Sequence, residues 1–160
     1  MVIKNTQKKG ISITNKVGEI ILEPTEMTIL RKEADKNGKM EYVITTPGEY
    51  EVEQIAVTAF PPFPSVIIQI EQNNIVYLPN PADNYPAEVI NEMERVDILI
   101  LPGKRYDLVE KLAPLLVIPL DDTALMAEKM GAEIPEAVKS LAIKDHADLP
   151  EETQLINLSL

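Results

Sequence analysis

Cysteine and tryptophan are absent from this sequence of 160 residues, and it has a single histidine. Without cysteine the chain has no disulfide, no cysteine-ligated zinc site and no cysteine nucleophile. Aromatic residues make up only 4% of the chain, which leaves few rings for stacking against nucleobases. Because the lack of disulfides fits a reducing compartment, we expect a cytoplasmic protein.

Basic residues are also scarce, since 15 lysines and arginines face 26 aspartates and glutamates and give a formal net charge of −11. Nucleic-acid backbones and anionic membrane surfaces both attract clustered lysine and arginine. No apolar run approaches the roughly 20 residues that span a bilayer. Residues 1–5 contain no apolar signal core. We therefore expect neither a nucleic-acid partner nor a membrane partner.

The remaining composition is that of an ordinary globular protein, with 45% hydrophobic and 26% charged residues. A chain of this length suits one domain and buries about two-thirds of the surface that its unfolded form exposes. The sequence thus predicts a single domain over residues 1–160.

The first half of the sequence has the short alternating runs that are typical of β-hairpins. The polar stretch 31–39 predicts a solvated loop, and Pro61 is expected to end the long apolar run before it. The turn Glu71-Gln72-Asn73-Asn74 predicts a hairpin, because asparagine tolerates left-handed turn positions. The predicted strands are 11–14, 17–22, 41–45, 50–60, 66–70 and 75–78.

After Leu78 the apolar period changes from that of strands to that of helices. Three helices are predicted: the first begins near Pro86, the second includes Leu108–Leu112, and the third ends at Gly131. Between them, the continuous apolar strands 96–101 and 115–118 imply a sheet that is covered on both faces. Hairpins followed by strand–helix alternation predict a layered α/β sandwich.

Several segments resemble a known family. Residues 46–52, Thr-Pro-Gly-Glu-Tyr-Glu-Val, are similar to the "PGEYEV" signature of a metallo-β-lactamase-fold subgroup related to ascorbate-6-phosphate lactonase. Residues 96–102 and 117–120 resemble the "VDILLIP" and "VIPMHY" strands of that family, in the same order. The resemblance implies an α/β fold of the αββα-sandwich type, in a reduced form of the metallo-β-lactamase fold.

The residues that would carry the chemistry of that family are missing. The family holds one or two metal ions with histidines and aspartates, and the metal activates a water molecule. The resemblance places a histidine-rich stretch between Pro24 and Thr46, where this sequence has no histidine. It places Asn80 where the family has a bridging aspartate, and Asp121 where it has a histidine. We therefore expect a non-catalytic scaffold without zinc or another cofactor, which binds a protein partner or forms a homo-oligomer.

A second hypothesis is that the chain is an enzyme. Asn80, Asp83, Asp121 and Asp122 follow the ends of predicted strands, where sites form in layered α/β folds. Their oxygen atoms could form a rebuilt magnesium or calcium site for a metal-dependent hydrolase. We favour the simpler interpretation that Asp121 or Asp122 caps the helix that begins near Thr123, and that Asp83 or Asn84 caps the helix at Tyr85-Pro86. Glu49 could act as a general base in a vestigial site, but the simpler interpretation is that it supports the Pro47-Gly48 turn.

A third hypothesis is a small-anion binding module. Lys104 and Arg105 follow Pro102-Gly103 at a strand end, where they could hold an anion at a helix N-terminus. The alternative is that both are ordinary solvated charges. His146 lies between two aspartates in a polar stretch and is predicted to be a surface residue.

Overall fold

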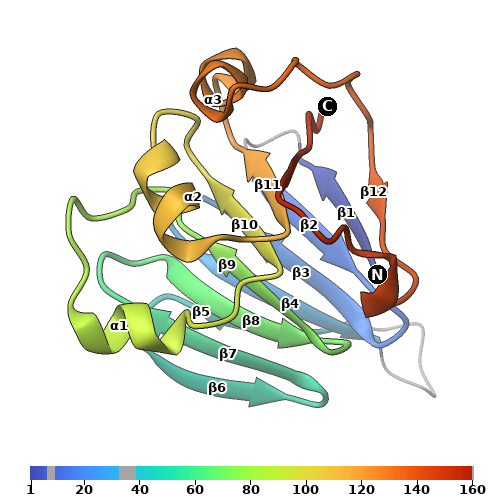
Figure 1. The fold of residues 1–160 in the computed structure, drawn as a ribbon. Helices are drawn as coiled ribbons and strands as arrows, with labels where there is room; N and C mark the ends of the chain where they lie inside the picture. The colour runs from blue at the N-terminus through green and yellow to red at the C-terminus, as the bar shows by residue number, and fades with distance from the viewer. Residues whose placement is uncertain (7–9, 33–38, 160) are drawn as a thin grey trace.

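The chain folds into two stacked β-sheets with helices on one side (Figure 1). A computed structural model describes residues 1–6, 10–32 and 39–159. The first sheet is antiparallel and has the spatial order β12 (Leu141–Ala142), β1 (Val2–Asn5), β2 (Ile11–Thr14), β3 (Gly18–Leu22), β4 (Met27–Lys32), β5 (Lys39–Ile44). The second sheet has the order β13 (Gln154–Leu155), β11 (Leu116–Pro119), β10 (Ile98–Leu101), β9 (Asn73–Tyr77), β8 (Ser65–Ile70), β7 (Ile55–Phe60), β6 (Gly48–Val52).

The second sheet changes direction along its width. Strands β6 to β9 form an antiparallel meander, whereas β9, β10, β11 and β13 run parallel to one another. The parallel part needs crossover connections, and these contain the helices α1 (Ala87–Glu92), α2 (Tyr106–Leu112) and α3 (Thr123–Met130). All three helices lie on the outer side of the second sheet (Figure 1).

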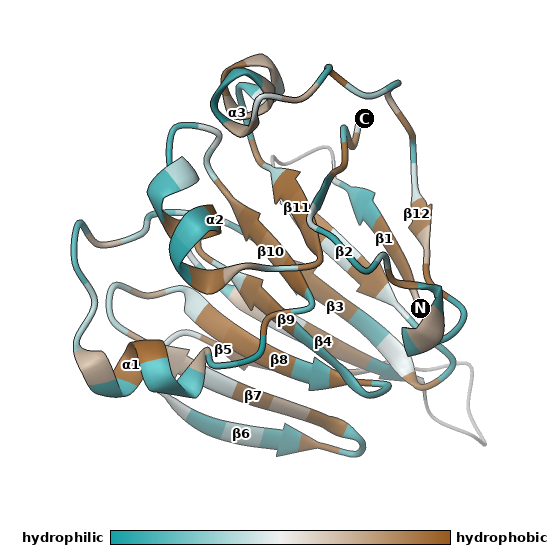
Figure 2. Ribbon diagram, in the orientation of Figure 1, coloured by the Kyte–Doolittle hydropathy of each residue, from teal (hydrophilic) through white to brown (hydrophobic). Residues whose placement is uncertain are grey.

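Burial follows from this layering. Strand β10 is buried throughout because Ile98 and Ile100 face the first sheet, while Leu99 and Leu101 face the helices. The central strands β8 to β11 are accordingly the most apolar part of the ribbon (Figure 2). The layered α/β sandwich expected from the sequence is confirmed, with one apolar core between the sheets and another beneath the helices.

Two sequence-based expectations need correction. Residues 50–60 are not one strand, because a turn at Glu53 and Gln54 separates β6 from β7. Glu53 adopts a left-handed φ of 57°. Glycine and asparagine are the residues that usually indicate such a turn, and neither occurs at positions 53 and 54. The predicted loop 31–39 begins too early, since Arg31 belongs to β4. Residues 33–38 of that loop lie outside the described part of the chain.

Other local features agree with the sequence. Gly131 ends α3 in a left-handed conformation with φ of 64°, as a C-terminal glycine is expected to do. Pro86 immediately precedes α1. Within the described residues, none of the helices is both long enough and apolar enough to cross a membrane.

Candidate functional site

The parallel strands β9, β10 and β11 end together at one edge of the sandwich. Their pairing extends one residue beyond the strands, because the amide of Leu78 donates to the carbonyl of Ile100 at 2.8 Å and that of Leu120 donates to Leu101 at 2.8 Å. The loops that follow therefore start side by side. This is the edge at which ligand sites form in open α/β sheets.

One pocket lies between the two sheets at this edge, and we name it the inter-sheet pocket. Its volume is about 410 Å³. The end of β1 and the turn after β3 contribute its residues from the first sheet, and the ends of β9, β10 and β11 contribute those from the second sheet. The lining residues are Asn5, Thr6, Pro24, Tyr77, Pro79, Asn80, Pro102, Leu120 and Asp121.

A second pocket of about 370 Å³, the outer pocket, adjoins the first through the shared residues Pro79, Asn80, Pro102 and Asp121. Its other lining residues are Pro81, Asp83, Lys104 and Arg105. The structure thus brings together five of the seven residues selected from the sequence: Asn80, Asp83, Lys104, Arg105 and Asp121.

The other two residues lie elsewhere. Asp122 caps α3, because its carboxylate accepts a hydrogen bond from the amide of Leu125 at 3.2 Å. This is the capping role that the simpler interpretation predicted for α3. The same interpretation is wrong for α1, because the residue that precedes this helix is Pro86 and no side chain among the described residues caps it. Glu49 is an exposed residue of β6, the edge strand of the second sheet, and does not line either pocket.

Asp121 has a specific structural contact at the pocket rim. Its Oδ1 accepts a hydrogen bond from the amide of Gly103 at 2.8 Å. The bond ties the loop after β11 to the loop after β10. Asn80 makes a longer contact across the sheets, in which its Nδ2 donates to the carbonyl of Pro24 at 3.5 Å.

The guanidinium of Arg105 is engaged on two sides. It donates to both oxygens of the Asp107 carboxylate at 2.8 Å and to the carbonyls of Pro81 and Ala82 at 3.2 and 2.9 Å. The hydrogen bonds to Asp107 raise the pKa of Arg105 above its ordinary range and lower the pKa of Asp107. Much of the charge that a bound anion would need is therefore already balanced, while Lys104 stays exposed.

The residues of the two pockets do not fit a zinc site. Zinc requires three or four converging nitrogen, sulfur or carboxylate ligands. The outer pocket offers only Asp83 and Asp121 as carboxylates, and Lys104 and Arg105 line the same space. Across the described chain, no group of three or more histidine, aspartate and glutamate side chains is arranged to hold a metal ion.

Tyr77 is the pocket residue that sequence reasoning missed. Its side chain is completely buried at the end of β9, and its hydroxyl has no hydrogen-bond partner among the described residues. Burial, with a smaller contribution from the charge of Glu23, raises the pKa of Tyr77 far above its ordinary value. The only signal in the sequence is a residue with a polar hydroxyl at the end of the apolar run Ile75-Val76-Tyr77.

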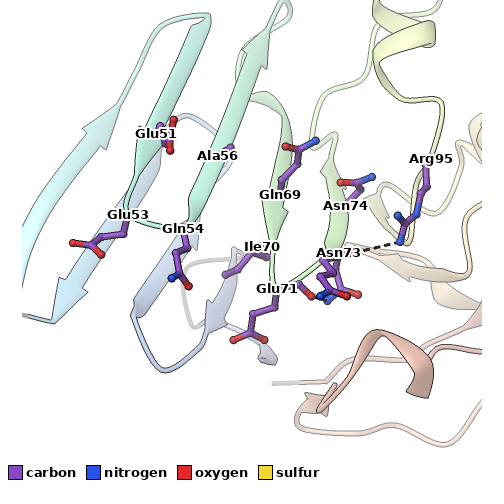
Figure 3. Close-up of a pocket in the computed structure, with 11 residues that line it drawn as sticks. Glu51, Glu53, Gln54, Ala56, Gln69, Ile70, Glu71, Asn73, Asn74 and Arg95 are labelled. Carbon is purple, nitrogen blue, oxygen red and sulfur yellow. Dashed lines mark hydrogen bonds between the residues drawn. The ribbon is translucent and has the colours of Figure 1, made fainter.

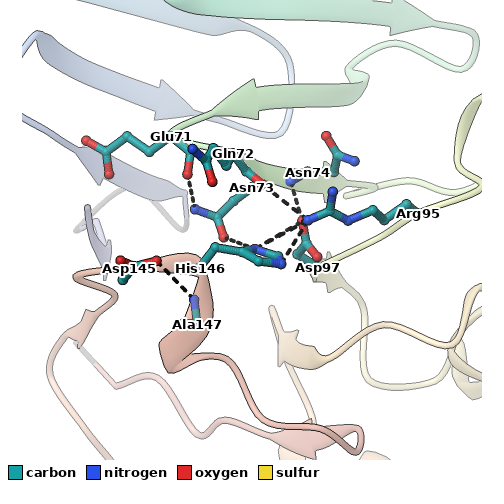
Figure 4. Close-up of polar contacts among 9 residues, drawn as sticks. All are labelled: Glu71, Gln72, Asn73, Asn74, Arg95, Asp97, Asp145, His146 and Ala147. Carbon is teal, nitrogen blue, oxygen red and sulfur yellow. Dashed lines mark hydrogen bonds and ion pairs between the residues drawn. The ribbon is translucent and has the colours of Figure 1, made fainter.

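A polar cluster occupies the opposite end of the parallel strands (Figure 4). The buried carboxylate of Asp97 accepts a hydrogen bond from the Asn74 amide at 2.8 Å and lies 3.4 Å from the guanidinium of Arg95. His146 Nε2 lies 2.9 Å from Arg95, and its Nδ1 lies 3.2 Å from Asn73 Oδ1. Since arginine only donates, the histidine nitrogen is the acceptor in its contact with Arg95.

The single histidine is thus far along the strands from both pockets, in a 3₁₀ turn η1 (His146–Asp148). Beside this cluster a polar hollow of about 600 Å³ runs along the hairpin ends of β6 to β9 (Figure 3). Two of its glutamates are paired: Glu53 with Arg31, and Glu71 with the N-terminal amine of Met1 at 3.2 Å. These contacts pair two of the three glutamates that line the hollow, and Glu51 is the third.

No protein-family model and no curated protein matches the chain. A solved structure does match, that of a proposed Zn-dependent hydrolase of the metallo-β-lactamase superfamily from Thermotoga maritima. The TM-score is 0.72, and the match covers 98% of this chain and 97% of that chain. The chain has a metallo-β-lactamase-like fold. The sequence identity is 14%, so the similarity establishes the fold, and the lactonase-related subgroup stays a prediction.

Proposed function

We propose that this chain is a non-catalytic protein of the metallo-β-lactamase-like fold that acts by binding, with the two strand-end pockets as its binding site. The observation that carries the proposal is the donor set at the pockets, in which Asp83 and Asp121 share the outer pocket with Lys104 and Arg105. Two carboxylates facing two cations suit polar recognition better than capture of a metal ion.

The engaged state of these side chains supports the same proposal. Asp121 holds the Gly103 amide, and Arg105 holds Asp107 and two backbone carbonyls. Asn80 offers a neutral amide where the family resemblance places an aspartate, so it supplies no negative charge to a metal. The loops are thus held in a defined shape by their own polar contacts, as a pre-formed binding site requires.

Metal analysis combined with activity assays tests the proposal. Protein purified without a chelator or an affinity tag would be incubated with zinc, manganese, magnesium and calcium, and its metal content measured by mass spectrometry. We expect metal far below one ion per chain and no turnover of ester, lactone or phosphodiester substrates. A stoichiometric ion with turnover, both lost in Asp121→Ala, would instead support a rebuilt hydrolase site at the outer pocket, with Asn80, Asp83 and Asp121.

Self-assembly is the second function that we propose, because a specific edge strand favours it. Among the described residues, β5 pairs with β4 alone, and its Met40 and Val43 side chains are 40% and 50% exposed. Natural edge strands usually carry charges that prevent pairing. The edge strand β6 of the other sheet exposes two glutamates, Glu49 and Glu51, whereas β5 exposes Glu41 beside the apolar Met40 and Val43.

Sedimentation equilibrium tests the self-assembly. We expect a dimer that Val43→Lys converts to monomer, because a lysine on β5 opposes pairing with a second copy. Thr25→Lys is the control, since it adds the same charge at an exposed position in the turn between β3 and β4. A wild-type protein that remains monomeric would rule out assembly through β5.

A further inference from the structure

The buried hydroxyl of Tyr77 is unusual in this molecule. Its ring packs in the core between the sheets, together with residues such as Ile3 and Ile75. Among the side-chain nitrogen and oxygen atoms that the structure describes, the Tyr77 hydroxyl is the only one that is buried without a hydrogen-bond partner. Buried polar groups are almost always paired, since an unpaired group loses its bonds to water and gains none in return.

Comparison with other buried polar groups shows that the fold can satisfy such atoms. The hydroxyl of Ser65 donates to the carbonyl of Pro62 at 2.6 Å, and the hydroxyl of Tyr85 accepts from the amide of Ala82 at 3.1 Å. The Asp97 carboxylate has the Asn74 amide. Tyr77 therefore stands out as a buried group whose partner has to come from outside the described residues.

The position of Tyr77 indicates where such a partner would be. Tyr77 is one of the residues that line the inter-sheet pocket. The pocket volume of about 410 Å³ lies within the range of small-molecule sites, about 300–1,000 Å³. The other polar side chains of this pocket already have partners. Asn5 donates to the Leu158 carbonyl, Thr6 accepts from the Gly10 amide, Asn80 donates to the Pro24 carbonyl, and Asp121 accepts from the Gly103 amide. Tyr77 also lines this pocket, and its hydroxyl is the polar side-chain group among the described lining residues that is left without a partner.

The surroundings limit the chemistry of a ligand. The raised pKa of Tyr77 keeps its hydroxyl protonated, so it offers a hydrogen to an acceptor atom. Asp121 at the rim, and Glu23 close enough to influence Tyr77, both disfavour an anion. The walls are apolar, formed by three prolines and a leucine: Pro24, Pro79, Pro102 and Leu120.

We infer that the inter-sheet pocket binds a small uncharged molecule with an apolar ring or short chain and a carbonyl or ether oxygen that accepts a hydrogen bond from Tyr77. This inference rests on the proposed binding role and names the class of ligand. The prolines and Leu120 contact the apolar body, and the phenol orients the oxygen atom. Pockets that are mostly apolar with one directed polar group are typical of small-molecule sites.

A titration with three matched probes tests the inference. Acetophenone carries a ring and a carbonyl, ethylbenzene lacks the acceptor, and benzoate carries a negative charge. Each would be added to the ¹⁵N-labelled full chain while the amide signals of Asn80, Gly103 and Leu120 are followed. We expect saturable shifts with acetophenone, weaker binding of ethylbenzene, and the weakest binding of benzoate.

Two tyrosine variants assign the effect to the phenol. Tyr77→Phe is expected to weaken acetophenone binding about threefold to tenfold, the effect of one neutral hydrogen bond, and to leave ethylbenzene binding unchanged. Tyr50→Phe is the control, because Tyr50 lies on β6, its hydroxyl donates to the Thr46 carbonyl, and it does not line the pocket. The Tyr77 ¹³Cζ signal in tyrosine-labelled wild-type protein is expected to shift with acetophenone, which tests the contact without a mutation.

The inference is overturned if none of the probes shifts the three amides, or if acetophenone binds wild type and Tyr77→Phe equally. A buried water molecule would then be the partner of the hydroxyl. These outcomes are separate from failure of the proposed function. Stoichiometric metal with turnover would overturn the non-catalytic role whatever acetophenone does, whereas absent metal with no probe binding would overturn the ligand class alone.

Discussion

Asn74 and Asp97 bind each other through two hydrogen bonds. The Asp97 amide donates to the Asn74 carbonyl at 2.9 Å, and the Asn74 amide donates to the Asp97 carboxylate at 2.8 Å. The pair joins the start of β9 to the residue before β10 (Figure 4). A carboxylate buried at this junction holds the amino ends of the parallel strands in register.

Replacing Asp97 tests this role. Asp97→Ala leaves the Asn74 amide without its acceptor, and we expect the free energy of unfolding to fall by about 2 kcal/mol, since a hydrogen bond to a charged group contributes about 1.5–3 kcal/mol. Arg95 adds little, because its side chain is 57% exposed. Urea denaturation measures the change. Asp97→Asn keeps an oxygen acceptor and is expected to lose less than half as much; an equal loss would assign the stabilisation to the charge.

The substitution Gly103→Ala tests the geometry of the pocket rim. A Cβ atom at this position would lie 2.4 Å from the Asp122 carbonyl oxygen and 2.5 Å from that of Asp121. Because both atoms are backbone, Gly103→Ala has to move the loop after β11. We expect a loss of about 1–3 kcal/mol in the free energy of unfolding, as for overpacked sites.

Gly131→Ala provides the control for Gly103. Its φ is +64° and no atom lies within 4 Å of an added Cβ, so it costs about 1–2 kcal/mol of backbone strain without moving the pockets. Amide shifts of Asn80 and Asp121 separate the two variants: Gly103→Ala is expected to move them and Gly131→Ala is not. Unmoved signals in Gly103→Ala would contradict the close packing of the two loops.

The raised pKa of Tyr77 predicts that the folded protein loses stability at alkaline pH. Its pKa is raised above the ordinary value of 10.0 in the folded chain, so its contribution is complete below pH 10 and declines as the pH rises above that value, where the unfolded chain releases the proton first. Urea denaturation is expected to show this decline in wild type and a weaker one in Tyr77→Phe. Absorbance at alkaline pH is expected to show one fewer ionised tyrosine in folded than in unfolded protein; ionisation of all 5 tyrosines before unfolding would contradict the burial.

The Arg105–Asp107 pair predicts a small loss of stability in acid. Arg105 lowers the pKa of Asp107 below its ordinary value of 3.8, so the contribution of the pair is complete above pH 3.8 and is lost as the pH falls through the lower folded value. The effect is small because the Asp107 side chain is 59% exposed. Urea denaturation between about pH 5 and about pH 2.5 should show a steeper decline in wild type than in Asp107→Asn. Equal slopes would show that the pair contributes nothing to stability.

The strongest sequence signals concerned the centre of the sheet. The apolar runs 96–101 and 115–118 predicted strands covered on both faces, and the observed strands β10 and β11 are buried throughout. Parallel strands place their carboxyl ends at one edge, so the grouping of Asn80 and Asp121 also followed from the pattern. The turn at Glu53 was missed because neither glycine nor proline marks it, and the pairing of β6 with β7 imposes it.

The sequence by itself thus determined the class of fold, the central strands and the scarcity of metal ligands, because apolar period and residue type are local properties. Only the tertiary structure decided that Glu49 lies away from the pockets, that Arg105 is engaged by Asp107, and that Tyr77 lacks a partner. Each of these depends on which groups from distant segments come within hydrogen-bonding distance. For Tyr77, the covering layer is the first sheet, and only the stacking of the two sheets removes its hydroxyl from water.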